Sequence, residues 1–213
     1  MGVTDTGIQR PERLPRAQRM HHTREQIIRA ALDLAAEDPG RRLTAERIAE
    51  RAGVSRRTFF NYFPTVEAAF YAPVQQLLHA AVRHLEALPL DTPLLDSLTL
   101  AVTAAAADEP LDRLGLCAHL GRRMPQLQGS DLEHWDFADA LLSEVFQKRY
   151  PRVDPFVVRC LTGAVVGACR AAVHEWDRRT DGDLAGQPDS LLYDLIATAL
   201  AHVSAGFAAV DSA

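Results

Sequence analysis

Apolar side chains recur at helical spacing along most of the 213-residue chain, and this pattern restricts the possible folds more than any other feature. Ile27, Ala31, Leu34 and Ala35 fall at positions i, i+4, i+7 and i+8, which places them on one helical face. No stretch of useful length alternates apolar and polar residues, and no Asn-Gly or Asp-Gly pair joins two such stretches. The sequence therefore predicts an all-α protein with about nine helices.

Proline and glycine divide the expected helices. The first helix is expected to begin at Thr23, where Thr-Arg-Glu-Gln fits a capping box, and to end before Pro39. A long helix over Val66–Leu88 contains Pro73, which is expected to kink or break it. Residues 1–20 show no apolar period and hold several arginines, so we expect a flexible basic arm there.

The charge is distributed unevenly between the two parts of the chain. Residues 1–64 hold 12 arginines against 8 acidic residues, a net charge of +4, while residues 65–213 hold 11 basic and 20 acidic residues, a net charge of -9. A basic head on an acidic body suits one polyanion-binding module on a solubilising scaffold, although chance placement of surface charge gives the same totals.

Cysteine content and hydropathy indicate where in the cell the protein is expected to act. Three cysteines, an odd and sparse set, indicate a reducing environment and no disulfide framework. The N-terminus has no apolar core typical of a secretory signal, and runs such as Leu98–Ala107 are too short to span a membrane. We therefore expect a cytoplasmic protein that does not associate with a membrane.

Two short helices joined by a tight turn form the most informative motif. Thr44 and Ser55 are expected to cap the N-termini of these helices, and Gly53 between them can adopt a left-handed conformation without steric cost. Ile48, Ala52, Val54 and Phe59 are expected to be buried between the helices. In such a helix-turn-helix unit the second helix can enter a DNA major groove.

The outer face of the second helix carries residue types that read DNA. Arg56, Arg57, Thr58 and Asn61 are expected there; arginine can bridge guanine O6 and N7, and asparagine can bridge adenine N6 and N7. The free N–H groups at the start of the helix also favour phosphate. For the arginines, the alternative is a solvated helix face with no ligand. For Phe60, packing in the core and contact with DNA are both compatible with the sequence.

The sequence resembles the tetracycline-repressor-like (TetR) transcription regulators over roughly residues 21–70. The resemblance rests on positions that agree in order and spacing: Thr44, Ile48-Ala49, Ala52-Gly53-Val54-Ser55, Thr58-Phe59-Phe60 and Tyr62-Phe63, with the helix Thr23–Ala36 before them and Glu67 after them. It implies a DNA-binding domain over residues 21–66, a ligand-binding and dimerisation domain over 67–213, and a homodimer on a palindromic operator of double-stranded DNA. It further implies a repressor that a small molecule releases.

The motif and the resemblance together give a set of expected DNA-contacting residues. This set is Thr44, Ser55, Arg56, Arg57, Thr58, Phe60, Asn61 and Tyr62. Two positions depart from the family pattern, because Phe60 stands where a tyrosine often meets phosphate and Val66 stands where a lysine is common. Losing one cation is expected to flatten the salt dependence of binding by about one unit of slope.

Two C-terminal segments look like the family's dimerisation helices. Pro155–Arg178 carries small residues at three- and four-residue spacing, and Asp189–Phe207 carries a wide stripe of leucine, isoleucine and valine. Two such helices from each chain can form a four-helix bundle across a two-fold axis. The alternative is that both stripes face the core of their own subunit.

A ligand pocket is expected among the helices between residues 88 and 178. The candidate lining residues are Leu120, Met124, Trp135, Phe137, Leu141, Phe146, His174 and Trp176. His119, His134 and His174 could anchor a polar ligand or act as pH-sensitive groups. Arg122 and Arg123 could pair with an acidic ligand, although a solvated helix face is the favoured alternative for them. The chemical class of the ligand does not follow from the sequence.

Other function classes find little support. No Gly-x-Ser-x-Gly, phosphate-binding glycine loop or cysteine–histidine signature is present, so no enzyme and no cofactor are expected. Asp131-x-x-His134 is a single pair at metal-ligand spacing, whereas a di-iron bundle needs two such motifs, so no metal is expected. A helical small-molecule-binding protein without operator binding and a non-specific DNA-packaging protein remain the alternatives.

Overall fold

The computed structural model describes residues 15–127, 130–181 and 190–206, except the side chains of residues 130–132. Within these ranges it contains ten helices and no strand, which confirms the predicted all-α class. The smaller head consists of α1 (Arg16–Glu37), α2 (Ala45–Arg51), α3 (Arg56–Tyr62) and α4 (Val66–Phe70). The body consists of α5 (Ala72–Ala87), α6 (Leu94–Asp108), α7 (Leu111–Arg123), α8 (Ser130–Arg149), α9 (Pro155–Thr180) and α10 (Leu191–Ser204).

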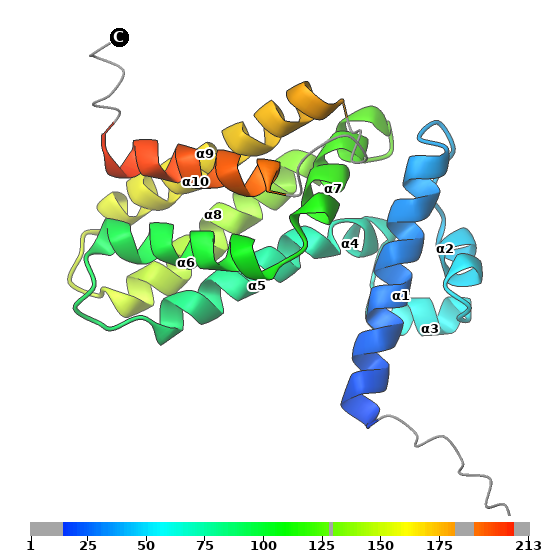
Figure 1. Ribbon diagram of the computed structural model, residues 1–213. Coiled ribbons are helices and arrows are strands. Elements are labelled where there is room, and N and C mark those ends of the chain that lie inside the picture. The colour runs from blue at the N-terminus through cyan, green and yellow to red at the C-terminus, as the bar shows by residue number, and fades with distance from the viewer. Residues whose placement is uncertain (1–14, 128–129, 182–189, 207–213) are drawn as a thin grey trace, which may run out of the picture.

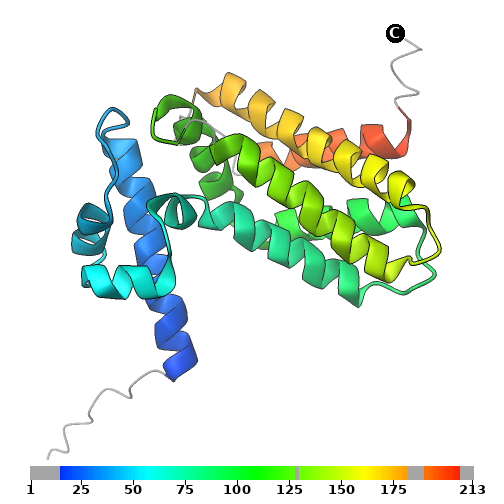
Figure 2. The same cartoon turned by 180° about the vertical axis from the view of Figure 1, so that it is seen from behind.

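The head and the body are joined at α4, α5 and α7, and the head projects from one end of the bundle (Figure 1). The turned view shows α8 and α9 side by side on the face of the body opposite α6 and α10 (Figure 2). The body core is formed by α5 to α10, whereas the head core combines α1 to α4 with one face of α7. Helix α7 is therefore shared between the two cores.

The long helix expected over Val66–Leu88 is divided, as Pro73 predicted. Helix α4 ends at Phe70, Tyr71 is the cap residue of both helices, and α5 begins at Ala72 with Pro73 in its first turn. Proline is tolerated in a first turn because the N–H that it lacks would have no helical partner there. The division accounts for a tenth helix where about nine were expected.

The prediction for the start of α1 was wrong. The helix begins at Arg16, after Pro15, instead of at Thr23, so residues 16–20 are helical and do not belong to a flexible arm. Residues 16–22 are exposed, and the first buried residue of the helix is Ile27. An exposed helical extension has no apolar period, which is why the sequence pattern did not reveal it. Residues 1–14 of the expected arm lie outside the described residues.

Helix α9 has an unusual distribution of apolar residues. Val158, Val165, Val173 and Trp176 are buried in the body core, whereas Phe156 at the start of the helix is 66% exposed. By length and composition alone, α9 is the one helix in the described part of the chain that could cross a membrane, and a core helix passes the same test. Within the most apolar 18-residue stretch of α9, only 33% is buried inside the subunit.

Candidate functional site

The turn between α2 and α3 is formed by local interactions that the sequence specifies. Gly53 has a φ of 67°, and its N–H donates to the Glu50 carbonyl while Val54 N–H donates to the Ala49 carbonyl. These two bonds satisfy the last carbonyls of α2 in the manner of a Schellman motif. Because this motif places a left-handed residue directly after the helix, glycine is favoured at position 53.

Both predicted N-caps are present. The Thr44 hydroxyl accepts from Arg47 N–H at 3.3 Å, and the Ser55 hydroxyl accepts from Thr58 N–H at 3.0 Å. The Thr58 hydroxyl also lies 2.8 Å from that of Ser55, so the two side chains are tied together at the start of α3. Thr65 caps α4 in the same way at 3.0 Å.

Helix α3 has one buried and one exposed face. Phe59 and Ile48 are fully buried where α3 packs on α2, and Ala52 and Val54 are half-buried beside them, so the predicted packing is confirmed for the first pair and partial for the second. Phe63 is also buried in the head core.

The predicted contact residues lie mainly on the other face of α3. Arg56, Arg57 and Asn61 are exposed, and Phe60 is 45% exposed, so Phe60 is not a core residue. Among the remaining predicted contacts, Thr44, Thr58 and Tyr62 are half-buried and Ser55 is exposed.

Arg56 is held at the protein surface and not inside the subunit. Its Nε lies 2.9 Å from a carboxylate oxygen of Glu46, and the two side chains are 65% and 58% exposed. Its guanidinium carbon lies 5.5 Å from the centre of the Phe60 ring. Arg24 of α1 lies over Phe63 in a comparable contact at 4.4 Å. The sequence did not indicate the Glu46 contact, because it joins two elements across the turn.

An apolar cavity lies in the core of the body. Its volume is about 50 Å³, and α5 to α10 all contribute side chains to it. The surface exposed to it is apolar and is formed by Val74, Leu77, Leu78, Ala81, Val102, Leu114, Trp135, Ala138, Leu142, Val165, Val166, Cys169, Val173 and Ile196. This volume is well below the roughly 300–1,000 Å³ of an open ligand pocket, so the described helices are closely packed around it.

The predicted lining residues match this cavity poorly. Only Trp135 lines it; Leu120 and Met124 lie on the opposite face of α7, in the head core. Phe137 and His174 are exposed. The remaining three are packed in or against the body core away from the cavity: Leu141, Phe146 and Trp176. Helix α7 packs against both the head core and the body core. The spacing of apolar residues along one helix does not show which of the two cores each side chain enters.

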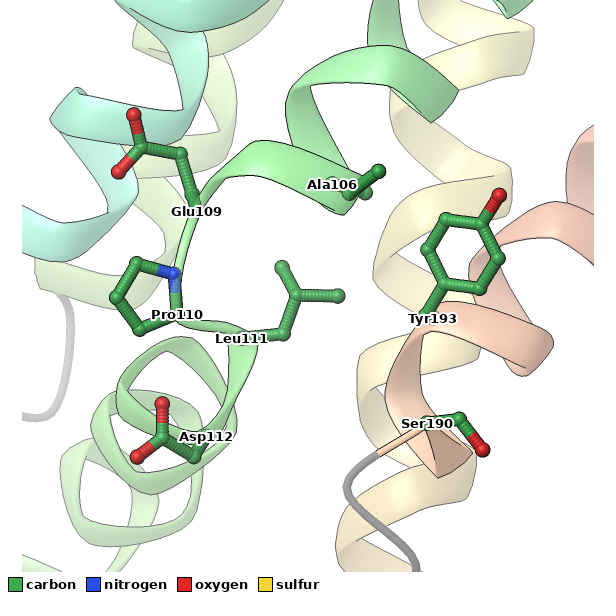
Figure 3. A pocket seen from close by; sticks show the side chains of 8 residues that line it. Ala106, Glu109, Pro110, Leu111, Asp112, Ser190 and Tyr193 are labelled. Atoms are coloured by element: carbon green, nitrogen blue, oxygen red, sulfur yellow. The ribbon is translucent and has the colours of Figure 1, made fainter.

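A wider recess of about 660 Å³ opens at the surface between the α6–α7 connection and the start of α10 (Figure 3). Glu109 and Asp112 line one side of it, and Ser190 and Tyr193 line the other. Ser190 directly follows residues 182–189, which lie outside the described residues.

Four side-chain hydrogen bonds connect the head to the body, and residues of α7 make two of them. Glu25 of α1 accepts from Arg113 of α7 at 2.8 Å and from Gln76 of α5 at 2.6 Å. Cys117 of α7 donates its thiol to the Phe70 carbonyl at 3.2 Å. Gln126, just beyond α7, accepts from Leu43 N–H at 2.9 Å. The position of α7 is therefore linked to that of the head.

A cluster of charged groups fixes the C-terminal end of α7 to α9. The Asp177 carboxylate lies 2.5 Å from His119 Nδ1 and 2.6 Å from a terminal nitrogen of Arg122. Arg123 pairs with Asp181 at the end of α9. Burial opposes ionisation of Asp177, but hydrogen bonds from Arg122 and His119 outweigh it and lower its pKa. Arg122 and Arg123 thus contact acidic side chains of their own chain.

Burial keeps two of the three cysteines in the thiol form, and His134 lies against an aromatic ring. Burial raises the pKa of the Cys169 thiol to about 12 and also raises that of Cys117, so neither is a reactive thiolate. Cys160 is exposed. The His134 ring lies 4.0 Å from that of Tyr71, and the Asp131 side chain is not described.

Comparison with known proteins gives consistent matches. Residues 27–70 match the bacterial regulatory proteins of the tetR family, and residues 92–208, more than half of the chain, match the MftR C-terminal domain. The chain is 27% identical to the HTH-type transcriptional regulator TcmR of Streptomyces glaucescens over 179 residues, 79% of each protein.

A solved structure shares the fold. A crystal structure described as a TetR-family transcriptional regulator from Mesorhizobium loti matches with a TM-score of 0.54 at 18% identity, covering 90% of this chain and 98% of that one. A transcriptional regulator from Rhodococcus matches with a TM-score of 0.48 at 18% identity, covering 86% of this chain and 96% of that one.

Proposed function

Because the chain belongs to the TetR family of DNA-binding transcription regulators, whose members are not enzymes, we propose that it is a homodimeric repressor which an apolar effector releases from a palindromic operator. In this proposal the head, with α1 to α4, binds DNA in place of the expected residues 21–66, and the body, with α5 to α10, binds the effector and the partner subunit in place of the expected residues 67–213. A repressor of this kind acts in the cytoplasm, where its operator lies.

The observation that carries the proposal is the exposed face of α3. Arg56, Arg57 and Asn61 project from a helix whose opposite face is locked into the head core by Phe59. A rigidly mounted helix can present its side chains to base edges in the major groove. Thr44 and Tyr62 contact phosphates in this proposal, and Ser55 and Thr58 present the N-terminus of α3 to the backbone.

The cavity supports an apolar effector. No charged side chain is among its lining residues and the surface exposed to it is apolar, so a charged ligand would lose its hydration without gaining a charged partner. A ligand larger than the present 50 Å³ must separate the surrounding helices. Leu114 places α7 among them, and α7 also contributes Leu120 and Met124 to the head core.

This shared helix provides a route from effector to DNA. Displacement of α7 would act on the head through the Arg113–Glu25 pair and the Gln126–Leu43 hydrogen bond. Two recognition helices must lie about 34–36 Å apart to enter successive major grooves, so a small rotation of each head lowers operator affinity. We expect the effector-bound and DNA-bound dimers to differ in this separation.

The exposed side of α9 supports the homodimer. Gly163, Ala164 and Gly167 are exposed there, and an added Cβ at Gly167 would meet no atom within 4 Å, so a partner helix can approach closely. The stripe of α10 gives less support, because Leu192, Ile196 and Leu200 are buried in the subunit's own core. We therefore place the centre of the dimer interface on α9, with α10 at its edge.

Selection of bound duplexes from a random pool tests this function most broadly. The proposal expects an enriched inverted repeat with one half-site per subunit. Enrichment of no sequence despite tight binding would point to a DNA-packaging protein, and no binding at all would point to a small-molecule-binding protein without an operator. Either result would contradict the proposed repressor.

A further inference from the structure

The ion pair between Glu46 and Arg56 has no evident role in stability. It joins the first turn of α2 to the first turn of α3, with 2.9 Å between Nε and the carboxylate, and both side chains are mostly exposed. Exposed pairs of this kind add little to folding because solvent screens them. A carboxylate on the DNA-facing side of a binding domain also repels phosphate, which makes its position there unfavourable for affinity.

The contact does restrict the Arg56 side chain from two sides. Glu46 engages Nε, and the Phe60 ring lies 5.5 Å from the guanidinium carbon. Phe60 is itself held by an edge-to-face contact with the buried Phe59, with 5.3 Å between ring centres and 89° between ring planes. With Nε engaged, the two terminal nitrogens of Arg56 remain to donate, and a pair of parallel N–H groups is what guanine O6 and N7 accept.

We propose that Glu46 is a positioning residue which, together with the Phe60 ring, orients the Arg56 guanidinium to read one base pair in each half-site, and that it lowers the affinity for DNA of any sequence. The inference rests on the proposed function, because it requires α3 to enter the major groove. It also gives Phe60 a role that needs no hydroxyl: the ring contacts the arginine instead of a phosphate.

The proposal predicts two opposite effects of Glu46→Gln. Removing one negative charge near the backbone raises affinity for random duplex several-fold, with the gain shrinking as salt increases. Freeing Arg56 lowers the ratio of operator to random-duplex affinity by about three- to ten-fold, at the lower end of what one base contact contributes, because the arginine itself remains. The lost preference is confined to one base pair per half-site. Loss of a purely repulsive or structural group would not produce this pattern.

The experiment measures operator selection and fluorescence anisotropy for the full-length chain and matched variants. Glu50→Gln removes an exposed charge one turn further along α2 and is expected to leave the affinity ratio within two-fold. In an Arg56→Ala background, Glu46→Gln is expected to cause no further change in base preference. Phe60→Leu is expected to relax the same base pair, and it gives the readout should Glu46→Gln fail to fold.

Three results would overturn the inference. One is an unchanged base preference in a folded Glu46→Gln variant, or in Phe60→Leu where Glu46→Gln does not fold. Another is a change that persists in the Arg56→Ala background, which would mean that Glu46 contacts a base itself. The third is parent protein that enriches no sequence at all, in which case the proposed function fails together with this inference, whereas the first two results leave the proposed function intact.

Discussion

The guanidinium of Arg113 on α7 donates to the carboxylate of Glu25 on α1 across a distance of 2.8 Å and 88 residues of sequence. Both side chains are largely buried, with 24% and 21% exposed. The same carboxylate accepts from Gln76 on α5. One acidic residue of the head therefore contacts two helices of the body, and loss of its charge affects the connection between head and body.

Glu25→Gln is expected to destabilise the protein by about 1–3 kcal/mol, because the Arg113 charge keeps its partial burial but loses its carboxylate partner. Urea denaturation of the parent and the variant measures the difference. Glu37→Gln is the matched control, since Glu37 is on the same helix but pairs with Arg51 on the exposed surface of the head. Equal shifts for the two variants would contradict the role given to Glu25.

Gly115→Ala tests the packing between α7 and α9. An added Cβ would lie 2.7–2.9 Å from three atoms of the Trp176 ring, which is 3% exposed and has little room to move. Overpacking costs about 1–3 kcal/mol and the helix propensity of alanine returns at most about 1 kcal/mol, so we expect a net loss of about 1–2 kcal/mol. Gly40→Ala, whose Cβ would meet only ordinary contacts, is expected to change thermal stability much less. A gain for Gly115→Ala would show that the ring can shift.

Gly53→Ala separates backbone conformation from packing. No atom lies within 4 Å of an added Cβ, so the whole effect comes from the left-handed φ of 67°. We expect a loss of about 1–2 kcal/mol in thermal or urea unfolding. Gly53→Asn is expected to lose less, because asparagine tolerates this conformation. Alanine and asparagine variants of equal stability would be inconsistent with a strained turn.

Acid unfolding tests the Asp177 cluster. Since the folded-state pKa of Asp177 is lowered from 3.8, the unfolded state binds the proton more tightly, so the carboxylate stabilises the fold above that value and less as pH falls below it. The free energy of unfolding of Asp177→Asn should therefore fall less than that of the parent protein between pH 5 and about pH 3. Other carboxylates with lowered pKa values, such as Glu175, contribute equally to the pH dependence of stability in the parent and in the variant. Parallel curves for parent and variant would rule out this contribution.

Local signals explain what the sequence could predict. The caps at Thr44 and Ser55 and the left-handed Gly53 each depend on residues within one turn of the chain, and all three are present, as is the buried Phe59 on the apolar face of α3. Their spacing also carries the family resemblance, which is why the DNA-binding head could be outlined from the order of its residues alone.

Contacts between distant segments explain what was missed. The apolar residues of α7 divide between two cores, so the spacing that predicts Leu120 and the following Met124 as pocket residues does not show that their side chains are buried in the head core. The Arg113–Glu25 pair leaves no periodic trace in the sequence. The exposed first turns of α1 have no apolar face at all, and the helix start was therefore placed seven residues too late, at Thr23 instead of Arg16.

Operator binding by an Arg56→Ala/Arg57→Ala double variant tests the central claim most directly, with Arg41→Ala/Arg42→Ala as the control that removes the same charge from another exposed part of the head. We predict that the α3 variant loses about 100-fold or more in operator affinity, while its affinity for random duplex falls only as far as that of the control. An α3 variant that binds the operator as tightly as the parent would contradict the account.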